Sequence, residues 1–339
     1  MDPDAEIEYD FSPYLYLYKS GRVRRFAAPD IVPASPDAAA GVISKDVPIN
    51  PSTGITARLF LPSLSMTPKK TKNKLPILVY FHGGGFVIGS PFSSTYHGFL
   101  DALVARAGVL AVSVDYRLAP EHPLPTAYDD SLVALRWVAS HANGEGTEEW
   151  LADHGDFRRI FLAGDSAGAN IAHNILLKLG DLPRGVSVEG MVLIHPYFWG
   201  KHPIVGETVE PRLRQKLESS WGFISGWKMG VEDPRVDPAM EEAARLRGLQ
   251  CRRVLVVVAE MDYYAARGRA YYETVKGSRW KGEVELYETP GERHVFHLKM
   301  PQSKKAMAMR KRIAAFLNGD DNFFYNLLSS VAHKFCGKF

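Results

Sequence analysis

From residue 75 onward, short apolar runs alternate with longer segments whose apolar residues recur at helical spacing. Near-continuous apolar runs are typical of strands buried on both faces, and strand–helix alternation is typical of a parallel sheet covered by helices. The pattern therefore predicts an α/β fold with a mostly parallel central sheet and helices on both faces. The expected strands are 75–81, 108–116, 159–164, 190–196, 253–260 and 282–288, and the expected helices are 95–106, 127–141, 167–179, 263–276 and 301–317. Two earlier runs, 42–50 and 55–62, are expected to form an antiparallel pair at one edge.

A Gly-Asp-Ser-Ala-Gly turn at 164–168 joins one of these strands to its helix. The spacing fits G-x-S-x-G, a nucleophile elbow, in which glycines permit a tight turn that exposes the hydroxyl of Ser166 above the sheet edge. The following helix start offers unpaired N–H groups and a positive dipole end, which stabilise an anion. An ordinary serine in a glycine-rich turn would give the same sequence. Whether Ser166 is a nucleophile therefore depends on the other motifs of the chain.

Three glycines follow His82 directly after the strand 75–81. Glycines leave backbone N–H groups unshielded, and an HGGG loop of this kind supplies oxyanion donors beside a nucleophilic serine. The N–H groups of Gly84, Gly85 and Ala167 are therefore predicted to form an oxyanion hole. His82 is expected to brace the loop.

A serine hydroxyl needs a base, and the base needs an orienting acid. Asp262 follows the strand 253–260, and His294 lies in the loop after 282–288. Because the carboxyl ends of parallel strands share one edge of a sheet, both side chains are expected to lie near Ser166. The sequence thus predicts a Ser166–His294–Asp262 catalytic triad in which His294 transfers the proton.

Several other polar residues lie near the same motifs. Glu260 is kept as a reserve acid and His297 as an alternative base. The remaining candidates are interpreted as structural: His97, His173, His195, Asp115 and Asp165.

Two regions interrupt the alternation and are expected to form lids over the pocket. Residues 1–40 hold many aromatic residues and prolines without a strand pattern, and residues 197–235 hold three tryptophans and a short amphipathic helix. Ligands in open α/β sheets bind beyond the strand carboxyl ends, where such inserts lie. The candidate pocket or lid residues are Phe86, Val87, Tyr197, Phe198, Trp199, Trp221 and Trp227. An aromatic, uncharged lining favours apolar acyl or aromatic alcohol groups.

Composition excludes some classes of function. A net charge of +3 is too small to indicate nucleic-acid binding, and the basic run 69–74 has no aromatic residue to stack on a base. No apolar run of about 18 residues predicts a transmembrane helix, and the acidic start does not resemble a secretory signal. Cys251 and Cys336 fit neither a zinc site nor a disulfide framework, so a cytoplasmic location is expected.

The end of the chain is expected to be an extension of a single domain that spans residues 1–318. Residues 319–339 place several apolar side chains on one helical face, which usually docks on its own domain. A dimer contact or a membrane-surface contact is the alternative, and the oligomeric state, monomer or homodimer, stays open.

The combination of "HGGGF", "DYRLAPEHPLP", "GDSAGAN", Asp262 and "HVFHL", in this order, resembles the hormone-sensitive-lipase-like branch of α/β-hydrolases. The segments 10–26 and 280–298 look like its plant carboxylesterases, and the resemblance spans roughly residues 8–318. It implies the same triad, the same oxyanion donors and lids over the pocket. Bulky Tyr263 and Tyr264 depart from the smaller residues that relatives often carry after the acid.

The sequence therefore predicts a serine carboxylesterase that acts on a small-molecule ester through an acyl-enzyme, without metal or cofactor. The resemblance leaves two alternatives. One is a dehydratase or cyclase that reuses the same groups for proton transfer. The other is a non-catalytic hormone receptor, which fits less well because receptor-like relatives lack the histidine that this chain keeps at His294.

Overall fold

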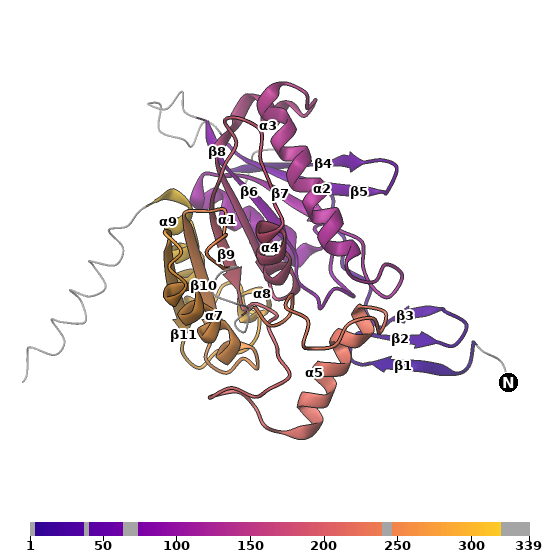
Figure 1. Ribbon diagram of the computed structural model, residues 1–339. Coiled ribbons are helices and arrows are strands. Elements are labelled where there is room, and N and C mark those ends of the chain that lie inside the picture. The colour runs from indigo at the N-terminus through magenta and orange to yellow at the C-terminus, as the bar shows by residue number, and fades with distance from the viewer. Residues whose placement is uncertain (1–3, 37–40, 64–73, 239–245, 320–339) are drawn as a thin grey trace, which may run out of the picture.

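The computed structural model describes residues 4–36, 41–63, 74–238 and 246–319, and it contains the predicted alternation of strands and helices (Figure 1). Eight strands form one sheet in the order β11-β10-β9-β8-β6-β7-β5-β4. They are β4 (Val42–Asn50), β5 (Ile55–Pro62), β6 (Leu75–Phe81), β7 (Leu110–Asp115), β8 (Gly155–Asp165), β9 (Val188–Ile194), β10 (Arg253–Ala259) and β11 (Glu283–Thr289).

The strand directions match the prediction. β4 pairs antiparallel with β5, and β5 pairs antiparallel with β7, whereas the other neighbours in the sheet are parallel. The predicted antiparallel pair thus lies at one edge, and the α/β class with a mostly parallel sheet is confirmed.

Helices cover both faces of the sheet (Figure 1). They are α1 (Ser94–Ala107), α2 (Thr126–Ser140), α3 (Glu149–His154), α4 (Ala167–Leu177), α5 (Pro211–Ile224), α7 (Ala265–Gly277), α8 (Phe296–Lys299) and α9 (Lys304–Asn318), with a 3-10 turn, η2 (His141–Asn143), after α2. Side chains of α2, α4 and α7 share one buried cluster with one face of the sheet, and side chains of α1 and α9 share another with the opposite face.

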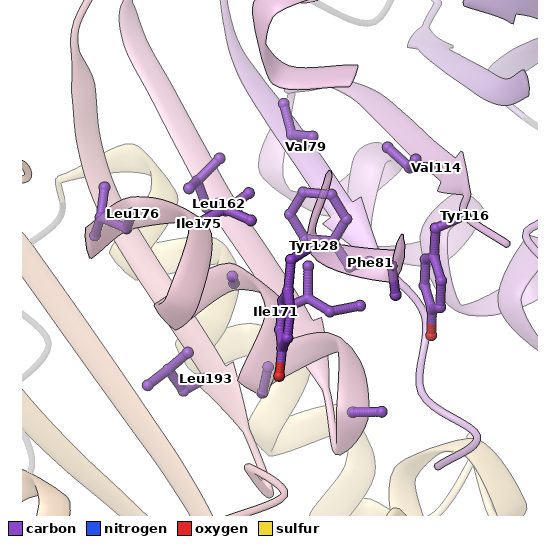
Figure 2. Close-up of a cluster of buried hydrophobic side chains, with 14 of the residues drawn as sticks. Val79, Phe81, Val114, Tyr116, Tyr128, Leu162, Ile171, Ile175, Leu176 and Leu193 are labelled. Carbon is purple, nitrogen blue, oxygen red and sulfur yellow. The ribbon is translucent and has the colours of Figure 1, made fainter. Parts of the chain in front are cut away.

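The first of these clusters fixes α4 against the sheet. Figure 2 shows Leu162, Leu193 and Phe81 from the central strands beside Ile171 and Ile175 of α4. All five side chains are at most 1% exposed. Burial of each such side chain contributes about 1.5–3 kcal/mol to stability, so the start of α4 is held firmly against the sheet.

One strand is longer than its apolar run predicts. β8 begins at Gly155, pairing with Leu75, whereas the sequence indicated a start at residue 159. Its first residues include Arg158 and Arg159, which lie where the strand emerges from the core. Hydrophobic patterning cannot detect a strand end whose side chains face solvent.

The N-terminal region contains strands, although its sequence shows no strand pattern. It forms a separate three-stranded antiparallel sheet of β1 (Ile7–Phe11), β2 (Leu15–Tyr18) and β3 (Val23–Arg25). The strands are only three to five residues long, and the β1–β2 register shifts between Ile7 and Tyr9. Too few alternations remain for a period of two to be visible in the sequence.

This small sheet lies beside α5, the helix of the second predicted lid region (Figure 1). The ring of Tyr9 stacks on Phe223 at 4.4 Å between centroids, and the Tyr9 hydroxyl donates to Ser219 Oγ at 3.1 Å. Arg25 connects the sheet to the body, because its Nε donates to the carbonyl of Val87 and its guanidinium pairs with Glu121. The two predicted lid segments therefore form one unit.

None of the helices in the described ranges combines the length and the hydrophobicity that crossing a bilayer requires. The predicted amphipathic extension, apart from Gly319, which caps α9, lies outside the described residues.

Candidate active site

Ser166 stands on a sharp turn between β8 and α4. Its φ of +52° lies in the left-handed region that non-glycine residues rarely adopt. A Cβ on Gly164 would lie 2.3 Å from the carbonyl carbon of Gly168, and a Cβ on Gly168 would lie 1.9 Å from the carbonyl oxygen of Phe81. Both flanking glycines are therefore required by close backbone approach, and the turn has the geometry of a nucleophile elbow.

The three side chains predicted to act together meet at this turn. His294 Nε2 lies 2.9 Å from Ser166 Oγ, and His294 Nδ1 lies 2.7 Å from Asp262 Oδ2. Asp262 also accepts the N–H of Tyr264 at 3.1 Å, which fixes its carboxylate. Ser166 is 5% exposed, and the His294 side chain is 26% exposed. The arrangement gives an accessible imidazole between a hydroxyl and a buried carboxylate, as proton transfer from the hydroxyl requires.

The alternative acid and base lie elsewhere. Glu260 accepts the N–H of Gly291 at 2.6 Å. His297 is 2% exposed, and neither of its ring nitrogens has a hydrogen-bond partner among the described residues. His173 is paired with the Tyr271 hydroxyl, and His97 lies 3.1 Å from Arg58 Nη1.

The glycine loop after β6 is held from below by a buried aspartate. Gly83 N–H donates to Asp165 Oδ1 at 3.1 Å and to the Tyr96 hydroxyl at 2.8 Å, and Tyr80 also donates to Asp165. Burial raises the pKa of Asp165 to about 6, against these hydrogen bonds, which lower it. Asp165, adjacent to Ser166, thus links the loop to the elbow.

His82 braces the same loop, as predicted. Its Nδ1 lies 2.7 Å from the Gly83 carbonyl oxygen, and its ring stacks on Tyr116 at 4.3 Å. Burial lowers the pKa of His82 to about 4, so the ring is neutral near pH 7 and its Nδ1–H donates to the carbonyl.

Gly84 and Gly85 turn the loop sharply beyond this brace. Their φ angles are +110° and +62°, and the Gly84 carbonyl accepts the N–H groups of Val87 and Ile88. The N–H groups of Gly84 and Gly85 donate to no acceptor within the described parts of the chain. Ala167, as the first residue of α4, also carries a free helix N–H. The role of the Gly84, Gly85 and Ala167 N–H groups as oxyanion donors stays a prediction.

Replacing Gly84 by alanine tests that role. The new Cβ would lie 2.1 Å from the Ile88 carbonyl oxygen, so the loop must shift. Because the loss of one oxyanion donor costs roughly 10²–10³-fold in kcat, we expect a fall of that size in ester hydrolysis. The matched control is Gly54→Ala in the β4–β5 turn, which also has a positive φ, +77°, but no neighbour within 4 Å. Equal kcat in the two variants would contradict the assignment.

Aromatic side chains pack next to the triad. The rings of Phe86, Tyr197 and Trp221 lie about 6.2 Å from one another, and Tyr197 lies 4.9 Å from Tyr264. Tyr264 in turn contacts the ring of His294 edge-on at 5.2 Å. We call Phe86, Tyr197, Trp221 and Tyr264 the aromatic cluster.

The other candidate pocket residues lie around this cluster or away from it. Val87 is buried in the glycine loop, and Trp199 contacts Tyr264 at 6.2 Å. Phe198 packs instead on His173 and Tyr271, between α4 and α7. Trp227 is 58% exposed and packs on Tyr9 of the N-terminal sheet.

Comparison with known proteins decides the family. The family model for the α/β-hydrolase fold matches residues 78–298. The chain belongs to the α/β-hydrolase family. It is 47% identical to probable carboxylesterase 13 of Arabidopsis thaliana, over 94% of this chain and 99% of the relative. It is 44% identical to the chloroplastic tuliposide A-converting enzyme 1 of Tulipa gesneriana, over 94% and 80%.

Solved structures agree on the fold of this α/β-hydrolase. An esterase of Pyrobaculum calidifontis has 29% sequence identity and a TM-score of 0.65, covering 81% of this chain and 84% of that chain. The resemblance to plant carboxylesterases inferred from the sequence is therefore confirmed at the level of the family.

Two residues beside the site of this α/β-hydrolase were not predicted to serve it. In the sequence Tyr264 stands out only by its bulk, whereas in the structure its ring contacts that of His294 and its N–H donates to Asp262. His195 was interpreted as structural, but its Nδ1 accepts the N–H of Val295, directly after His294. For Tyr264 the sequence offers one hint, because this residue follows the predicted acid Asp262 by two positions. Nothing in the sequence relates residue 195 to residue 295.

His195, Asp262 and His294 present possible metal-ligand atoms within 4.8 Å of one another. Two of these residues already hydrogen-bond to each other, and the third accepts from the backbone. An ion bound to all three would have to break the His294–Asp262 hydrogen bond. The expectation that no metal or cofactor is needed stays a prediction.

His297 of this α/β-hydrolase makes stability depend on pH. Burial, and secondarily the neighbouring His294, lowers the pKa of His297 to about 3 from 6.5. The unfolded chain therefore binds a proton first as pH falls, so the contribution to stability is complete above pH 6.5 and is lost toward pH 3. Between pH 7 and pH 5 this loss is about 2 kcal/mol.

We expect His297→Phe to remove that part of the acid sensitivity. Urea unfolding at pH 7 and pH 5 should show a fall in unfolding free energy about 2 kcal/mol smaller in the variant than in wild type. The comparison uses only the change in unfolding free energy between pH 7 and pH 5, so a uniform loss of stability in the variant does not affect it. Identical falls in both proteins would show that His297 is not held neutral.

Proposed function

We propose that this protein is a serine carboxylesterase that hydrolyses small carboxylic esters through an acyl-enzyme. The observation that carries the proposal is the continuous hydrogen-bond chain from Asp262 through His294 to Ser166, at 2.7 and 2.9 Å. Relatives named carboxylesterase, at 47% and 45% identity over more than nine-tenths of the chain, support the same activity.

The proposed mechanism follows from the positions of the groups. Ser166 attacks the acyl carbon while His294 Nε2 takes its proton, and Asp262 stabilises the resulting imidazolium. His294 then gives the proton to the leaving alcohol, and a tetrahedral intermediate collapses to the acyl-enzyme. Water, deprotonated by His294, attacks the acyl carbon in turn, and the acid leaves as Ser166 regains its proton.

The negative oxygen of each tetrahedral intermediate needs donors that are already in place. The elbow puts the N–H of Ala167 at the start of α4, where the helix dipole favours negative charge. The N–H groups of Gly84 and Gly85 complete the proposed oxyanion hole, with Asp165 and His82 holding the loop.

The cap and the substrate preference belong to the same proposal. The unit formed by the N-terminal sheet and α5 is proposed to be the cap, together with the rest of 197–235. The aromatic cluster lies between α5 and the triad and carries no formal charge near pH 7. It favours esters with small apolar acyl groups or aromatic alcohols over anionic substrates.

Pre-steady-state hydrolysis of p-nitrophenyl acetate and butyrate tests the proposal. An acyl-enzyme whose hydrolysis is slower than its formation releases a burst of p-nitrophenol equal to the enzyme concentration, followed by steady turnover. Ester hydrolysis in which no acyl intermediate can be trapped would contradict the proposed mechanism.

A second candidate function is favoured by the relatives named tuliposide A-converting enzymes. Names of this kind fit a specialised metabolic enzyme, in which Ser166, His294 and Asp262 would move protons in an elimination or cyclisation. Such an enzyme would turn over one metabolite with little hydrolysis of p-nitrophenyl esters. The receptor alternative gains no support, because His294 is present and paired.

The compartment and the partners remain proposals. The relatives include chloroplastic and amyloplastic enzymes, so the predicted cytoplasmic location is one of several compartments compatible with the family. The proposed partner is a small-molecule ester, and the low net charge gives no reason to expect nucleic acid.

A further inference from the structure

Two residues next to the proposed triad adopt a backbone conformation that L side chains avoid. His195, directly after β9, has a φ of +47°, and Val295, directly after His294, has a φ of +48°. A left-handed conformation is unusual for any non-glycine residue, and for a β-branched side chain such as valine it is a genuine outlier. Such residues persist only where the surrounding structure holds them, and they concentrate at functional sites.

A single hydrogen bond joins these two residues across 100 positions of sequence. The N–H of Val295 donates to Nδ1 of His195 at 3.1 Å. His195 is itself fixed, because it is 1% exposed and its own N–H donates to the Val257 carbonyl of β10 at 2.8 Å. The imidazole of His195 thus connects the rigid sheet to the backbone immediately after His294.

The loop that carries His294 closes on itself beyond this connection. Phe296 N–H donates to the Arg293 carbonyl at 3.2 Å, and Leu298 N–H donates to the Val295 carbonyl at 3.0 Å. Neither bond ties the loop to the sheet. Before His294 the loop is held at the end of β10, where the Glu292 carbonyl accepts the N–H of Met261 at 2.8 Å. After His294, the N–H of Val295 anchors the turn to the end of β9 through a side chain.

We propose that His195 is a positioning residue for His294: its Nδ1 holds Val295 in the left-handed conformation and so aims the imidazole of His294 at Ser166. The proposal rests on the proposed function of Ser166 and His294. His195 itself does not touch the reacting atoms; its ring centroid lies 6.0 Å from that of His294.

The protonation state of His195 suits this role. Burial is the main cause that lowers the pKa of His195 well below 6.5; the neighbouring His297 and His294 act in the same direction and Asp262 in the opposite one. These three groups are the titratable neighbours that face the ring. Near pH 7 the ring is neutral, so Nδ1 accepts from Val295 and the proton is on Nε2, which has no partner among the described residues.

Two substitutions separate the acceptor from the bulk of the side chain. In His195→Asn, Oδ1 occupies nearly the position of Nδ1, and asparagine tolerates a positive φ. In His195→Leu, a side chain of similar size offers no acceptor. We expect His195→Leu to lower kcat for p-nitrophenyl butyrate roughly 10–100-fold, because small displacements of a catalytic group have effects of this size. KM should stay within about three-fold, since substrate contacts are unchanged.

His195→Asn is expected to keep kcat within about three-fold of wild type. A merely structural role would give both variants the same defect. Near-wild-type kcat in His195→Leu, or equal loss in both variants, would overturn the proposal.

Nuclear magnetic resonance tests the geometry without turnover, and its first measurement needs only the wild-type protein. In wild type labelled with ¹⁵N-histidine, His195 should be neutral with its proton on Nε2 at pH 7. The opposite tautomer would overturn the proposal. The low-field Nδ1–H proton of His294, identified by its loss in Asp262→Ala, should be retained in His195→Asn and shifted or lost in His195→Leu. If wild type hydrolyses no ester, the proposed function fails, but these spectra still decide the role of His195.

Discussion

Replacing Ser166 by alanine is expected to lower kcat for ester hydrolysis by roughly 10⁴–10⁶-fold, while KM changes only a few-fold. The substitution removes the nucleophile but leaves the aromatic cluster and the glycine loop in place. What activity remains should come from the oxyanion donors and from substrate binding. The variant should fold normally, because the strained backbone of the turn is set by Gly164 and Gly168 rather than by the hydroxyl.

A second buried serine supplies the control. Ser131 in α2 is fully buried, and its hydroxyl donates to the Ala127 carbonyl of the same helix. Ser131→Ala should retain kcat within about three-fold. Steady-state rates on p-nitrophenyl butyrate compare the two variants directly. A Ser166→Ala enzyme that keeps more than about one-hundredth of the wild-type rate would contradict the role of the serine.

Replacing Arg267 by methionine is expected to have the largest effect on stability, a loss of about 3–5 kcal/mol. Arg267 of α7 is fully buried and pairs with Glu207 at 3.0 Å and with Asp237 at 2.8 Å. Glu207 belongs to the proposed cap and Asp237 lies just after it, so the arginine joins that region to the hydrolase body. Its removal takes one cation from two largely buried carboxylates; Glu207 keeps its pair with Arg214 at 3.2 Å, so the cost arises mainly at Asp237 and from the lost hydrogen bonds of the guanidinium.

The matched control lies two residues away on the same helix. Arg269 pairs with Glu288, but both side chains are about one-third exposed. Exposed ion pairs contribute about 0–1 kcal/mol, so Arg269→Met should change stability by no more than that. Urea unfolding followed by tryptophan fluorescence measures both. Similar losses in the two variants would show that the buried ion pairs of Arg267 stabilise the fold no more than the exposed pair of Arg269.

The sequence predicted the central parts of the fold and of the candidate site because both depend on local patterns. The apolar runs fixed the parallel strands, and parallel strands place Asp262 and His294 at the edge where the elbow carries Ser166. The glycines at 164 and 168 reveal the turn in the sequence, because the close backbone approach there tolerates no other residue.

The features that escaped prediction depend on contacts between distant segments. The Arg267–Glu207 pair spans 60 positions, and the His195–Val295 bond spans 100. No local pattern specifies either contact. Trp227, a predicted pocket or lid residue, is 58% exposed and packs on Tyr9 of the N-terminal sheet, a contact that no local pattern specifies. The short strands β1 to β3 are stabilised by packing on α5, which a pattern in their own residues does not reveal.

The most direct test of the central claim is the mass of the intact protein after reaction with a fluorophosphonate, followed by peptide mapping of the adduct. Our account predicts one adduct per chain, on Ser166, formed quickly in wild type and at least about 10³-fold more slowly in His294→Ala, because the base that activates the hydroxyl is gone. An unmodified protein, or an adduct on any other residue, would contradict the claim that Ser166, His294 and Asp262 form a working nucleophilic site.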